Sequence, residues 1–326
     1  MKSKHWLARI FVFLLMVFST SACTGEAAPG FTPIITPPPT DIFEAAVDIL
    51  TATSTPTEES EATSTVASVP EETEEISLAN PLPPDPIPQS FQTSDGVELS
   101  GMFYPAAEVN APLIVLFHWA HGDQSAWGAI APWLQNRIDL AELPETSTSW
   151  LDVSWFPSMT EEVTYNVFTF TFRGCEGGCQ SFDREGWLLD AEAVMTYVSG
   201  LENVDLSRVA AIGASIGADG AVIGCYAYNR LLGGCLGALS LSPGGYLTRP
   251  YPEEVADLGA ETPPRPAWCL YSAGDAEAAA ACESAKGAHY QVVSYTDAAH
   301  GFAMIEPNRD PDPLMLILDF LSQIGL

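Results

Sequence analysis

The sequence predicts an α/β domain in which a mostly parallel β-sheet is covered by helices on both faces. From residue 89 onward, short runs rich in β-branched and aromatic residues alternate with longer helix-like segments, which is the pattern of a parallel sheet built from strand-helix-strand units. One of these runs, LIVLF at 113–117, is apolar throughout, as expected for a central strand that is buried on both faces.

The elements are expected in a regular order along the chain. An antiparallel hairpin at 90–104 turns at Asp95 and Gly96, because an Asp-Gly pair favours a turn. The expected later strands are 113–117, 163–172, 209–212, 235–241, 267–272 and 290–295. The expected helices are 127–137, 184–198, 216–228, 276–285 and 313–324. The segment 242–266, rich in Pro and Gly, is expected to be a connection too short for a large lid.

The first 23 residues have the three parts of an export signal. They contain a basic start, an apolar run at 10–18 and small residues leading to Cys23. The apolar run is shorter than the roughly 20 residues that a membrane-spanning helix needs. The ending resembles a bacterial lipoprotein signal, which implies cleavage before Cys23, lipidation of Cys23 and a location on the outer face of a bacterial membrane. An ordinary signal peptide with an incidental Cys23 is the alternative.

The segment 24–88 has a different composition from the rest of the chain. It is dominated by Pro, Thr, Ser, Glu and Ala, a mixture that cannot bury enough apolar surface to offset the entropy of ordering. We therefore predict a disordered tether at 24–88 and a folded domain at 89–326.

The charge of the chain is strongly acidic. The formal net charge is −30 at pH 7 and the isoelectric point is near 4.1. A nucleic-acid partner needs a basic face that displaces counterions from phosphates. Nucleic acid is therefore not an expected partner.

Six of the seven cysteines follow the export signal. An even number in an exported chain favours disulfides. Their spacing suggests the pairs Cys175–Cys179, Cys225–Cys235 and Cys269–Cys282. A zinc site needs a second ligand pair at a set spacing, and the sequence does not offer one near Cys175 and Cys179, so no metal is expected.

A candidate nucleophile lies between a predicted strand and a predicted helix. Residues 213–217 read GASIG and fit the pattern GxSxG. In this context a buried strand turns abruptly into a helix, which leaves the serine on a strained tip where small neighbours allow a close approach. Ser215 would then lie at the positive end of a helix, which favours a developing negative charge. The alternative is a Gly-rich turn in which Ser215 only caps the helix.

A serine hydroxyl needs a base, and the base needs an orienting acid. His300 lies in the loop after the last predicted strand, where a histidine belongs in the chain order serine, acid, histidine. Asp275 follows the strand 267–272 after a small-residue turn and is the predicted acid. Glu277 is the reserve, and Asp297 is too close to His300 along the chain to orient it. Asp275 as a simple helix cap is the alternative.

The loop after the strand 113–117 reads HWAHGD and resembles the α/β-hydrolase family, in which this strand commonly ends in His-Gly followed by an oxyanion donor. With His118 at the family's histidine, Ala120 takes the donor position and Trp119 stands where glycine is usual. The resemblance implies that the backbone N–H groups of Ile216 and Ala120 bind the oxyanion. The other register, through His121 and Gly122, would make Asp123 the donor and set a carboxylate against the oxyanion.

Further segments carry the same resemblance over 90–325. The run 172–174 looks like the Arg-Gly turn of the family, and AAHGF and YSAGDAEAA are similar to segments of dienelactone-hydrolase-like and small esterase branches. The resemblance implies an α/β-hydrolase fold and hydrolysis of an ester or related acyl bond through an acyl-enzyme, without a cofactor. A peptidase or thioesterase on the same fold and a non-catalytic binding lipoprotein stay open. The aromatic residues at 150–156 either wall an acyl pocket or pack a small core under a long loop.

Overall fold

The computed structural model describes residues 83–137, 151–160 and 163–326. The predicted export signal, the lipidation site Cys23 and residues 24–82 of the predicted tether lie outside these residues. Within the described ranges, no helix is both long enough and apolar enough to cross a membrane.

The strands form one eight-stranded sheet in the order β1-β2-β4-β3-β5-β6-β7-β8. β1 pairs antiparallel with β2, and β2 with β4, while all later neighbours are parallel. The strands are β1 Ile87–Gln92, β2 Glu98–Tyr104, β3 Ala111–Phe117, β4 Asn166–Phe170, β5 Val204–Ala214, β6 Cys235–Leu241, β7 Ala267–Ser272 and β8 Gln291–Tyr295. The predicted mostly parallel sheet is therefore confirmed.

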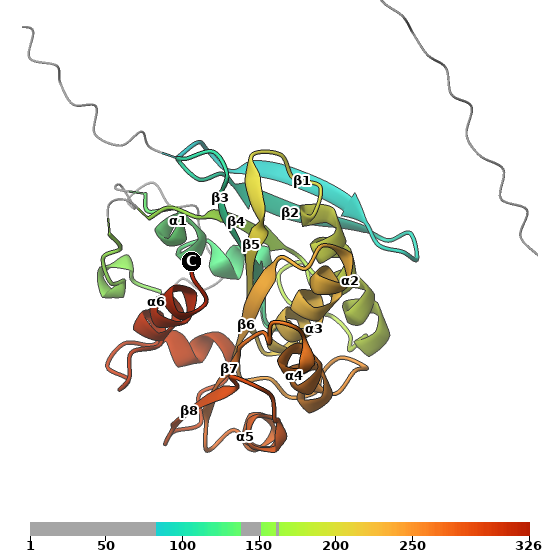
Figure 1. The fold of residues 1–326 in the computed structure, drawn as a ribbon. Helices are drawn as coiled ribbons and strands as arrows, with labels where there is room; N and C mark the ends of the chain where they lie inside the picture. The colour runs from blue at the N-terminus through green and yellow to red at the C-terminus, as the bar shows by residue number, and fades with distance from the viewer. Residues whose placement is uncertain (1–82, 138–150, 161–162) are drawn as a thin grey trace, which may run out of the picture. The chain divides into compact units, whose positions relative to one another are not determined.

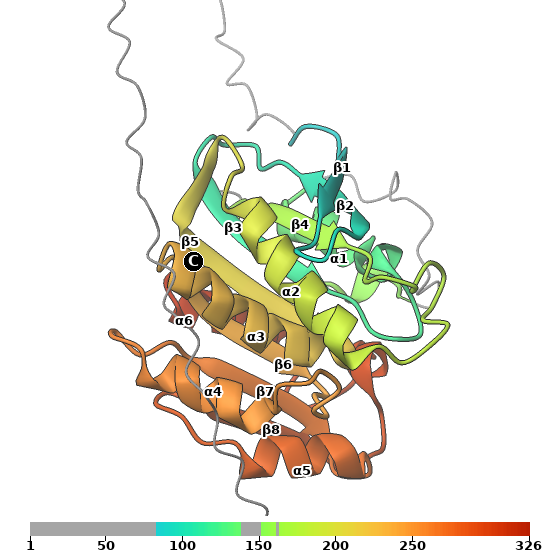
Figure 2. The ribbon, with the colours of Figure 1, turned by 90° about the vertical axis from the view of Figure 1, so that its right-hand side faces the viewer.

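Helices cover both faces of this sheet (Figures 1 and 2). One face carries α2 Arg184–Val198, α3 Ile216–Leu231, α4 Tyr251–Ala260 and α5 Ala276–Ser284. The other carries α1 Ile130–Leu134, α6 Pro313–Gln323 and the 3-10 turns η1 Gln124–Trp127 and η3 Gly301–Ile305. A further 3-10 turn, η2, spans Val153–Trp155.

The apolar run in β3 is explained by this layering. Side chains alternate between the two faces of a strand, and every residue of β3 is buried. Leu113, Val115 and Phe117 belong to the core under α2 and α3, whereas Ile114 and Leu116 belong to the core under α1 and α6.

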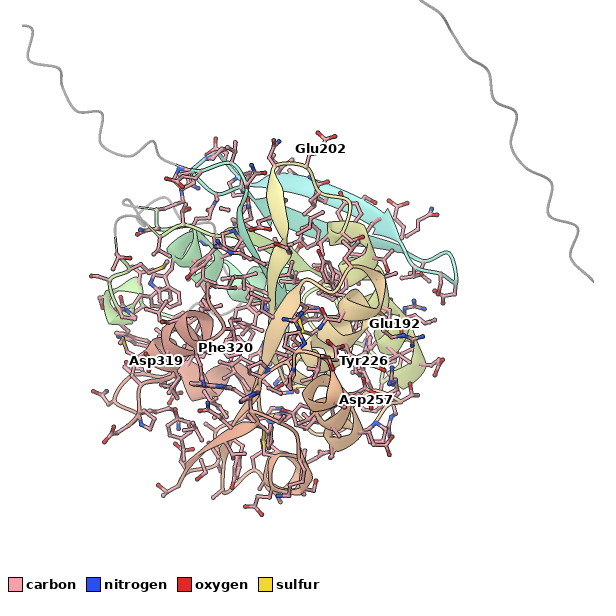
Figure 3. The ribbon with its side chains drawn as sticks, in the orientation of Figure 1. Glu192, Glu202, Tyr226, Asp257, Asp319 and Phe320 are labelled. Carbon is pink, nitrogen blue, oxygen red and sulfur yellow. A yellow bond between two sulfur atoms is a disulfide. The ribbon has the colours of Figure 1, made fainter. Side chains whose placement is uncertain are left out.

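The outer helices show the opposite pattern, with one apolar and one polar face. On α6, Phe320 is buried against the sheet while its neighbour Asp319 is exposed (Figure 3). The helix begins at Pro313, and the Asp312 carboxylate accepts hydrogen bonds from the N–H groups of Leu314 and Met315, which satisfies N–H donors that the first turn leaves unpaired.

Two helical segments differ from the sequence expectation, and β5 begins five residues before the strand expected at 209–212. The helix expected at 127–137 is reduced to η1 and the short α1, because Asn136 takes a left-handed conformation with φ 57° and ends the helix. The connection expected at 242–266 contains the helix α4, which starts with Tyr251 and Pro252 and was missed because the surrounding Pro and Gly residues favour a loop.

The cysteines of the domain lie in three bonded pairs, Cys175–Cys179, Cys225–Cys235 and Cys269–Cys282. These are the pairs that the sequence spacing suggested. The second joins α3 to β6 and the third joins β7 to α5, so each fastens a helix to the sheet.

Candidate active site

Ser215 lies on a sharp turn between β5 and α3. Its backbone has φ 55° and ψ −119°, a strained combination for a residue with a side chain. The glycines on either side make the turn possible. A Cβ on Gly213 would lie 1.8 Å from the carbonyl oxygen of Gly217, and a Cβ on Gly217 would lie 2.2 Å from that of Phe117. The GxSxG spacing is therefore required by backbone packing.

The structure brings Ser215, His300 and Asp275 together from three strand ends. Ser215 follows β5, Asp275 follows β7 and His300 follows β8. The Ser215 Oγ lies 2.8 Å from the His300 Nε2, and the Asp275 Oδ2 lies 2.6 Å from the His300 Nδ1. Such a chain of contacts allows the imidazole to take a proton from the hydroxyl while the carboxylate stabilises the resulting imidazolium.

The two acidic alternatives to Asp275, namely Asp297 and Glu277, have other partners. Asp297 accepts a hydrogen bond from the Ser272 Oγ at 2.5 Å and is ion-paired with Arg309. Glu277 lies in the first turn of α5 and interacts with Tyr246. Asp275 has two contacts, because its Oδ1 also caps α5 by accepting from the N–H of Ala278 at 3.3 Å.

Two backbone N–H groups near Ser215 are candidates for binding an oxyanion. Ile216 is the first residue of α3, and Ala120 lies in the loop after β3. Neither N–H has a hydrogen-bond acceptor among the residues that the structure describes. An oxyanion site needs backbone donors that no other acceptor occupies.

Asp123, the donor in the other register, has a structural task. Its Oδ1 accepts from the N–H of Ser125 and its Oδ2 from the N–H of Gly177, both at 2.8 Å. The carboxylate thereby caps η1 and joins two loops.

His118 is also structural. It is fully buried, its Nε2 accepts from the N–H of Phe172 at 2.9 Å, and its Nδ1 lies 2.7 Å from the carbonyl oxygen of Trp119. Burial lowers the pKa of His118 to about 4, so the ring is neutral at pH 7 and its Nδ1–H donates to Trp119. It joins the ends of β3 and β4.

Comparison with solved structures identifies the fold. An esterase of Pyrococcus furiosus is 14% identical with a TM-score of 0.51, over 73% of this chain and 92% of that one. A dienelactone hydrolase of Anabaena variabilis is 13% identical with a TM-score of 0.50, over 74% and 98%. An esterase of Pyrobaculum calidifontis is 14% identical with a TM-score of 0.51, over 74% and 86%. This chain has the α/β-hydrolase fold. No family model matches the sequence, and no curated protein matches it.

Within this α/β-hydrolase fold, a loop after β6 lies beside the candidate triad, a contact that the sequence did not predict. It carries Tyr246, whose ring centroid is 6.1 Å from that of His300, with the rings nearly perpendicular. Arg184 donates to the carbonyl oxygens of Gly245 and Leu247, both at 2.8 Å. The loop is therefore fixed from the α2 side.

Asp219, on α3, binds the backbone of the same loop. This fully buried carboxylate accepts from the N–H of Gly244 at 3.3 Å and from the N–H of Tyr246. Burial raises the pKa of Asp219 to about 7. The sequence signal for this contact is an acidic residue in the apolar first half of α3, because a buried carboxylate requires several donors.

Trp119 occupies the position where the resemblance led us to expect glycine. Its indole ring contacts Phe302 at 5.5 Å between centroids and lies against Gly301. A Cβ on Gly301 would lie 3.0 Å from the Trp119 Cε3 and 3.6 Å from the Ser215 Cβ. The indole therefore forms a wall close to Ser215. Phe182 is 61% exposed and lies edge-on to Tyr246.

Of the two alternatives for the aromatic segment at 150–156, the contacts of Phe156 match the small core under the loop. Trp150 lies outside the described residues. Phe156 packs on Trp133, with ring centroids 5.5 Å apart, and the Trp133 Nε1–H donates to the carbonyl of Pro157 at 2.8 Å. These contacts form a small core under the loop.

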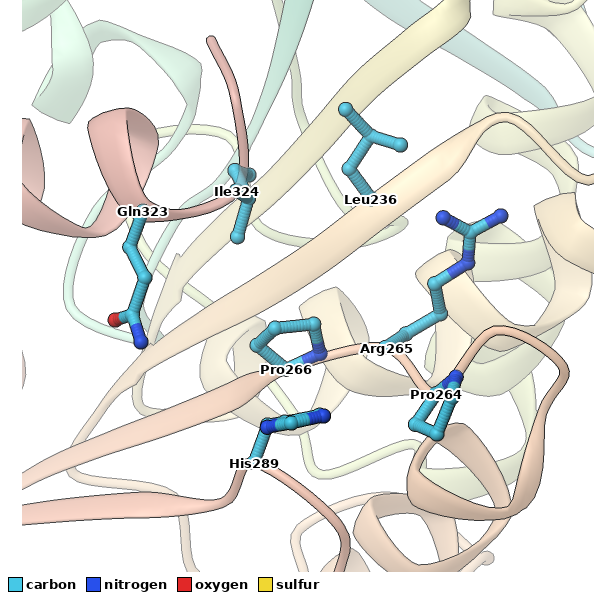
Figure 4. Close-up of a pocket in the computed structure, with 7 residues that line it drawn as sticks. All are labelled: Leu236, Pro264, Arg265, Pro266, His289, Gln323 and Ile324. Atoms are coloured by element: carbon cyan, nitrogen blue, oxygen red, sulfur yellow. The ribbon is translucent and has the colours of Figure 1, made fainter.

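A pocket elsewhere in the fold is separate from the triad (Figure 4). Its lining residues include Leu236, Pro266 and His289, which lie at the starts of β6, β7 and β8. The triad lies at the carboxyl ends of the same parallel strands, which is where α/β sheets bind their ligands. This pocket is therefore at the opposite end of the sheet.

Proposed function

We propose that this chain is a serine hydrolase that cleaves a carboxylic ester or a related acyl bond through an acyl-enzyme. The observation that carries the proposal is the pair of contacts at His300, 2.8 Å to the Ser215 Oγ and 2.6 Å to the Asp275 Oδ2. The likeness to esterases and a dienelactone hydrolase supports the reaction class at the level of the fold.

The proposed reaction has two halves. The Ser215 Oγ attacks the carbonyl carbon while the His300 Nε2 takes the hydroxyl proton, and the N–H groups of Ile216 and Ala120 bind the oxyanion. Collapse of this intermediate breaks the ester bond, and His300 gives its proton to the leaving alcohol. In the second half, water attacks the acyl-enzyme with His300 as base, which releases the acid and restores Ser215.

We further propose that the enzyme acts outside the cytoplasm, anchored through a lipid on Cys23. The export signal at 1–23 supports this location. The three disulfides support it as well, because disulfides persist in oxidising compartments. Globomycin-type inhibition of lipoprotein processing, followed by mass analysis of the chain, tests it. Accumulation of the uncleaved chain is expected, and a cleaved chain without lipid would contradict it.

The substrate class is tested by comparing short-chain p-nitrophenyl esters with a matched thioester and a peptide anilide. We expect the ester to be hydrolysed with the highest kcat/KM and Ser215→Ala to lose at least about 10³-fold in kcat, as removal of a nucleophile does in other triads. Preference for the anilide or the thioester would move the proposal to a peptidase or a thioesterase. Binding without turnover of any of them would favour a non-catalytic lipoprotein.

A further inference from the structure

The Cys175–Cys179 disulfide closes a small ring just after β4. The ring spans a sequence separation of four residues. Its backbone is held by hydrogen bonds from the N–H of Gly178 to the carbonyl of Cys175 at 2.9 Å and from the N–H of Gln180 to the carbonyl of Gly174 at 3.0 Å. Gly174, Gly177 and Gly178 all have positive φ, conformations that only glycine adopts easily.

This ring contacts the loop that carries Ala120. The N–H of Cys179 donates to the carbonyl oxygen of Ala120 at 2.8 Å. The N–H of Gly177 donates to the Asp123 Oδ2, also at 2.8 Å. Between these two bonds, Gly178 faces the backbone of His121, and an added Cβ would lie 3.6 Å from the His121 carbonyl carbon. The ring therefore holds both ends of the segment 120–123.

We propose that the Cys175–Cys179 disulfide is a positioning element of the oxyanion site. The inference rests on the proposed function, in which the Ala120 N–H donates to the oxyanion. The disulfide-closed ring would fix the orientation of that N–H. The carbonyl of Ala120 is anchored to the ring, so the Cα of Ala120 and the N–H that precedes it are held in place. Without the bond, three glycines with positive φ are free to relax, and the segment 120–123 loses its fixed support.

Loss of the disulfide is expected to weaken binding of the transition state and not of the substrate. An oxyanion develops only after attack, so a donor that has moved lowers kcat while the KM for the neutral ester changes little. Loss of an entire donor costs about 10²- to 10³-fold in kcat in another serine hydrolase. A displaced donor should cost roughly 10- to 100-fold.

The test is the double variant Cys175→Ser/Cys179→Ser in the full chain, with Cys225→Ser/Cys235→Ser as the matched control. The control removes a bond between α3 and β6 about 15 Å along α3 from Ser215. We expect the first variant to lose kcat 10-fold or more with KM within about 2-fold, and the control to lower the unfolding temperature with kcat unchanged. Both should still label to one fluorophosphonate per chain, the first more slowly.

If the first variant does not fold, Asp123→Asn tests the same contact between the ring and the segment 120–123. It can keep one oxygen for the Ser125 N–H and present an amide to the Gly177 N–H, which breaks one ring contact while the disulfide stays. A smaller loss of kcat at unchanged KM is expected. Wild-type kcat in a folded variant lacking Cys175–Cys179, or an equal loss in the control, would overturn the inference and leave the proposed function standing. An unlabelled and inactive wild type would instead remove the proposed function.

Discussion

At the scale of single residues, Asp275 combines a chemical and a structural contact. Its Oδ2 contacts the His300 Nδ1 at 2.6 Å, and its Oδ1 caps α5 through the N–H of Ala278. The alternatives posed by the sequence, triad acid or helix cap, are therefore both present in the geometry. A substitution by asparagine separates the two roles, because asparagine caps helices about as well as aspartate but carries no charge.

Asp275→Asn should lower kcat by roughly 10³- to 10⁴-fold, the size of the loss for the corresponding change in a serine protease. The free energy of unfolding should change by less than about 1 kcal/mol because the cap is kept. Steady-state kinetics and urea unfolding of the same preparation measure both. Asp312→Asn, which alters the equivalent cap of α6, is the control and should keep wild-type kcat. A fully active Asp275→Asn would exclude the orienting role.

Asp219 should make stability depend on pH. Burial raises its pKa from 3.8 to about 7, so the folded state holds this proton more tightly than the unfolded state. Its contribution to the free energy of unfolding is therefore largest below about pH 4 and is lost as the pH rises to about 7.

Asp219→Asn removes this titration. The wild-type minus variant difference in free energy of unfolding should fall between about pH 4 and pH 7 and be constant above about pH 8. Urea unfolding at several pH values measures it. Asp190 and Glu254, whose pKa values burial also raises, titrate in both proteins and cancel in the difference. A difference that does not vary with pH would contradict the raised pKa.

The residues of the candidate triad could be predicted because each depends on local sequence. Ser215 lies in a strand-turn-helix motif, and Asp275 and His300 follow recognisable strands. Tyr246 and Asp219 could not be predicted because their contact depends on how the loop after β6 folds over α3. That placement involves residues 27 positions apart and has no local periodicity.

At the scale of secondary-structure elements, the start of α3 lies very close to the end of β3. Gly217 allows it, since a Cβ there would lie 2.2 Å from the carbonyl oxygen of Phe117 and 2.5 Å from that of His118. Both obstacles are backbone atoms, which cannot rotate away as a side chain can.

Gly217→Ala should therefore move α3 away from β3 and destabilise the fold by about 3 kcal/mol or more, since overpacking against a rigid backbone is costly. Thermal unfolding and the soluble yield report the effect. Gly200→Ala is the matched control, because the nearest atom to an added Cβ is 3.6 Å away, and it should change stability by no more than about 0.5 kcal/mol. Equal stability of the two variants would refute this packing argument.

The first and last residues of an element could be predicted where its hydrophobic pattern is regular. They could not be predicted where Pro and Gly interrupt the pattern. The bounds of α2, β6 and β7 match the expectation. The helix α4 starts at a proline-containing turn within a Pro- and Gly-rich segment, where local signals favour a loop although tertiary packing of Tyr251, Val255 and Leu258 stabilises a helix.

At the scale of the whole molecule, the net charge of the chain is strongly negative, and a substrate must approach the site in its field. The chain carries 42 Asp and Glu against 12 Lys and Arg. Such a field concentrates cations and repels anions, and salt screens it over about 8 Å at physiological ionic strength.

A cationic ester should therefore be hydrolysed with a kcat/KM that falls as ionic strength rises from 10 to 500 mM, by about 3-fold or more. A neutral ester of the same size should show little change, and an anionic one should improve. Initial rates at low substrate concentration measure kcat/KM directly. If all three esters respond to salt alike, the field of the molecule does not act on substrate binding.

The most direct test of the account is fluorophosphonate labelling of the full chain, with the modified residue located by peptide mass spectrometry and Ser215→Ala as control. The hydrogen-bonded arrangement of Ser215, His300 and Asp275 predicts one label per chain on Ser215, absent from the variant and slowed in Asp275→Asn. A folded, oxidised protein that takes no label, or takes it on another residue, would contradict the triad.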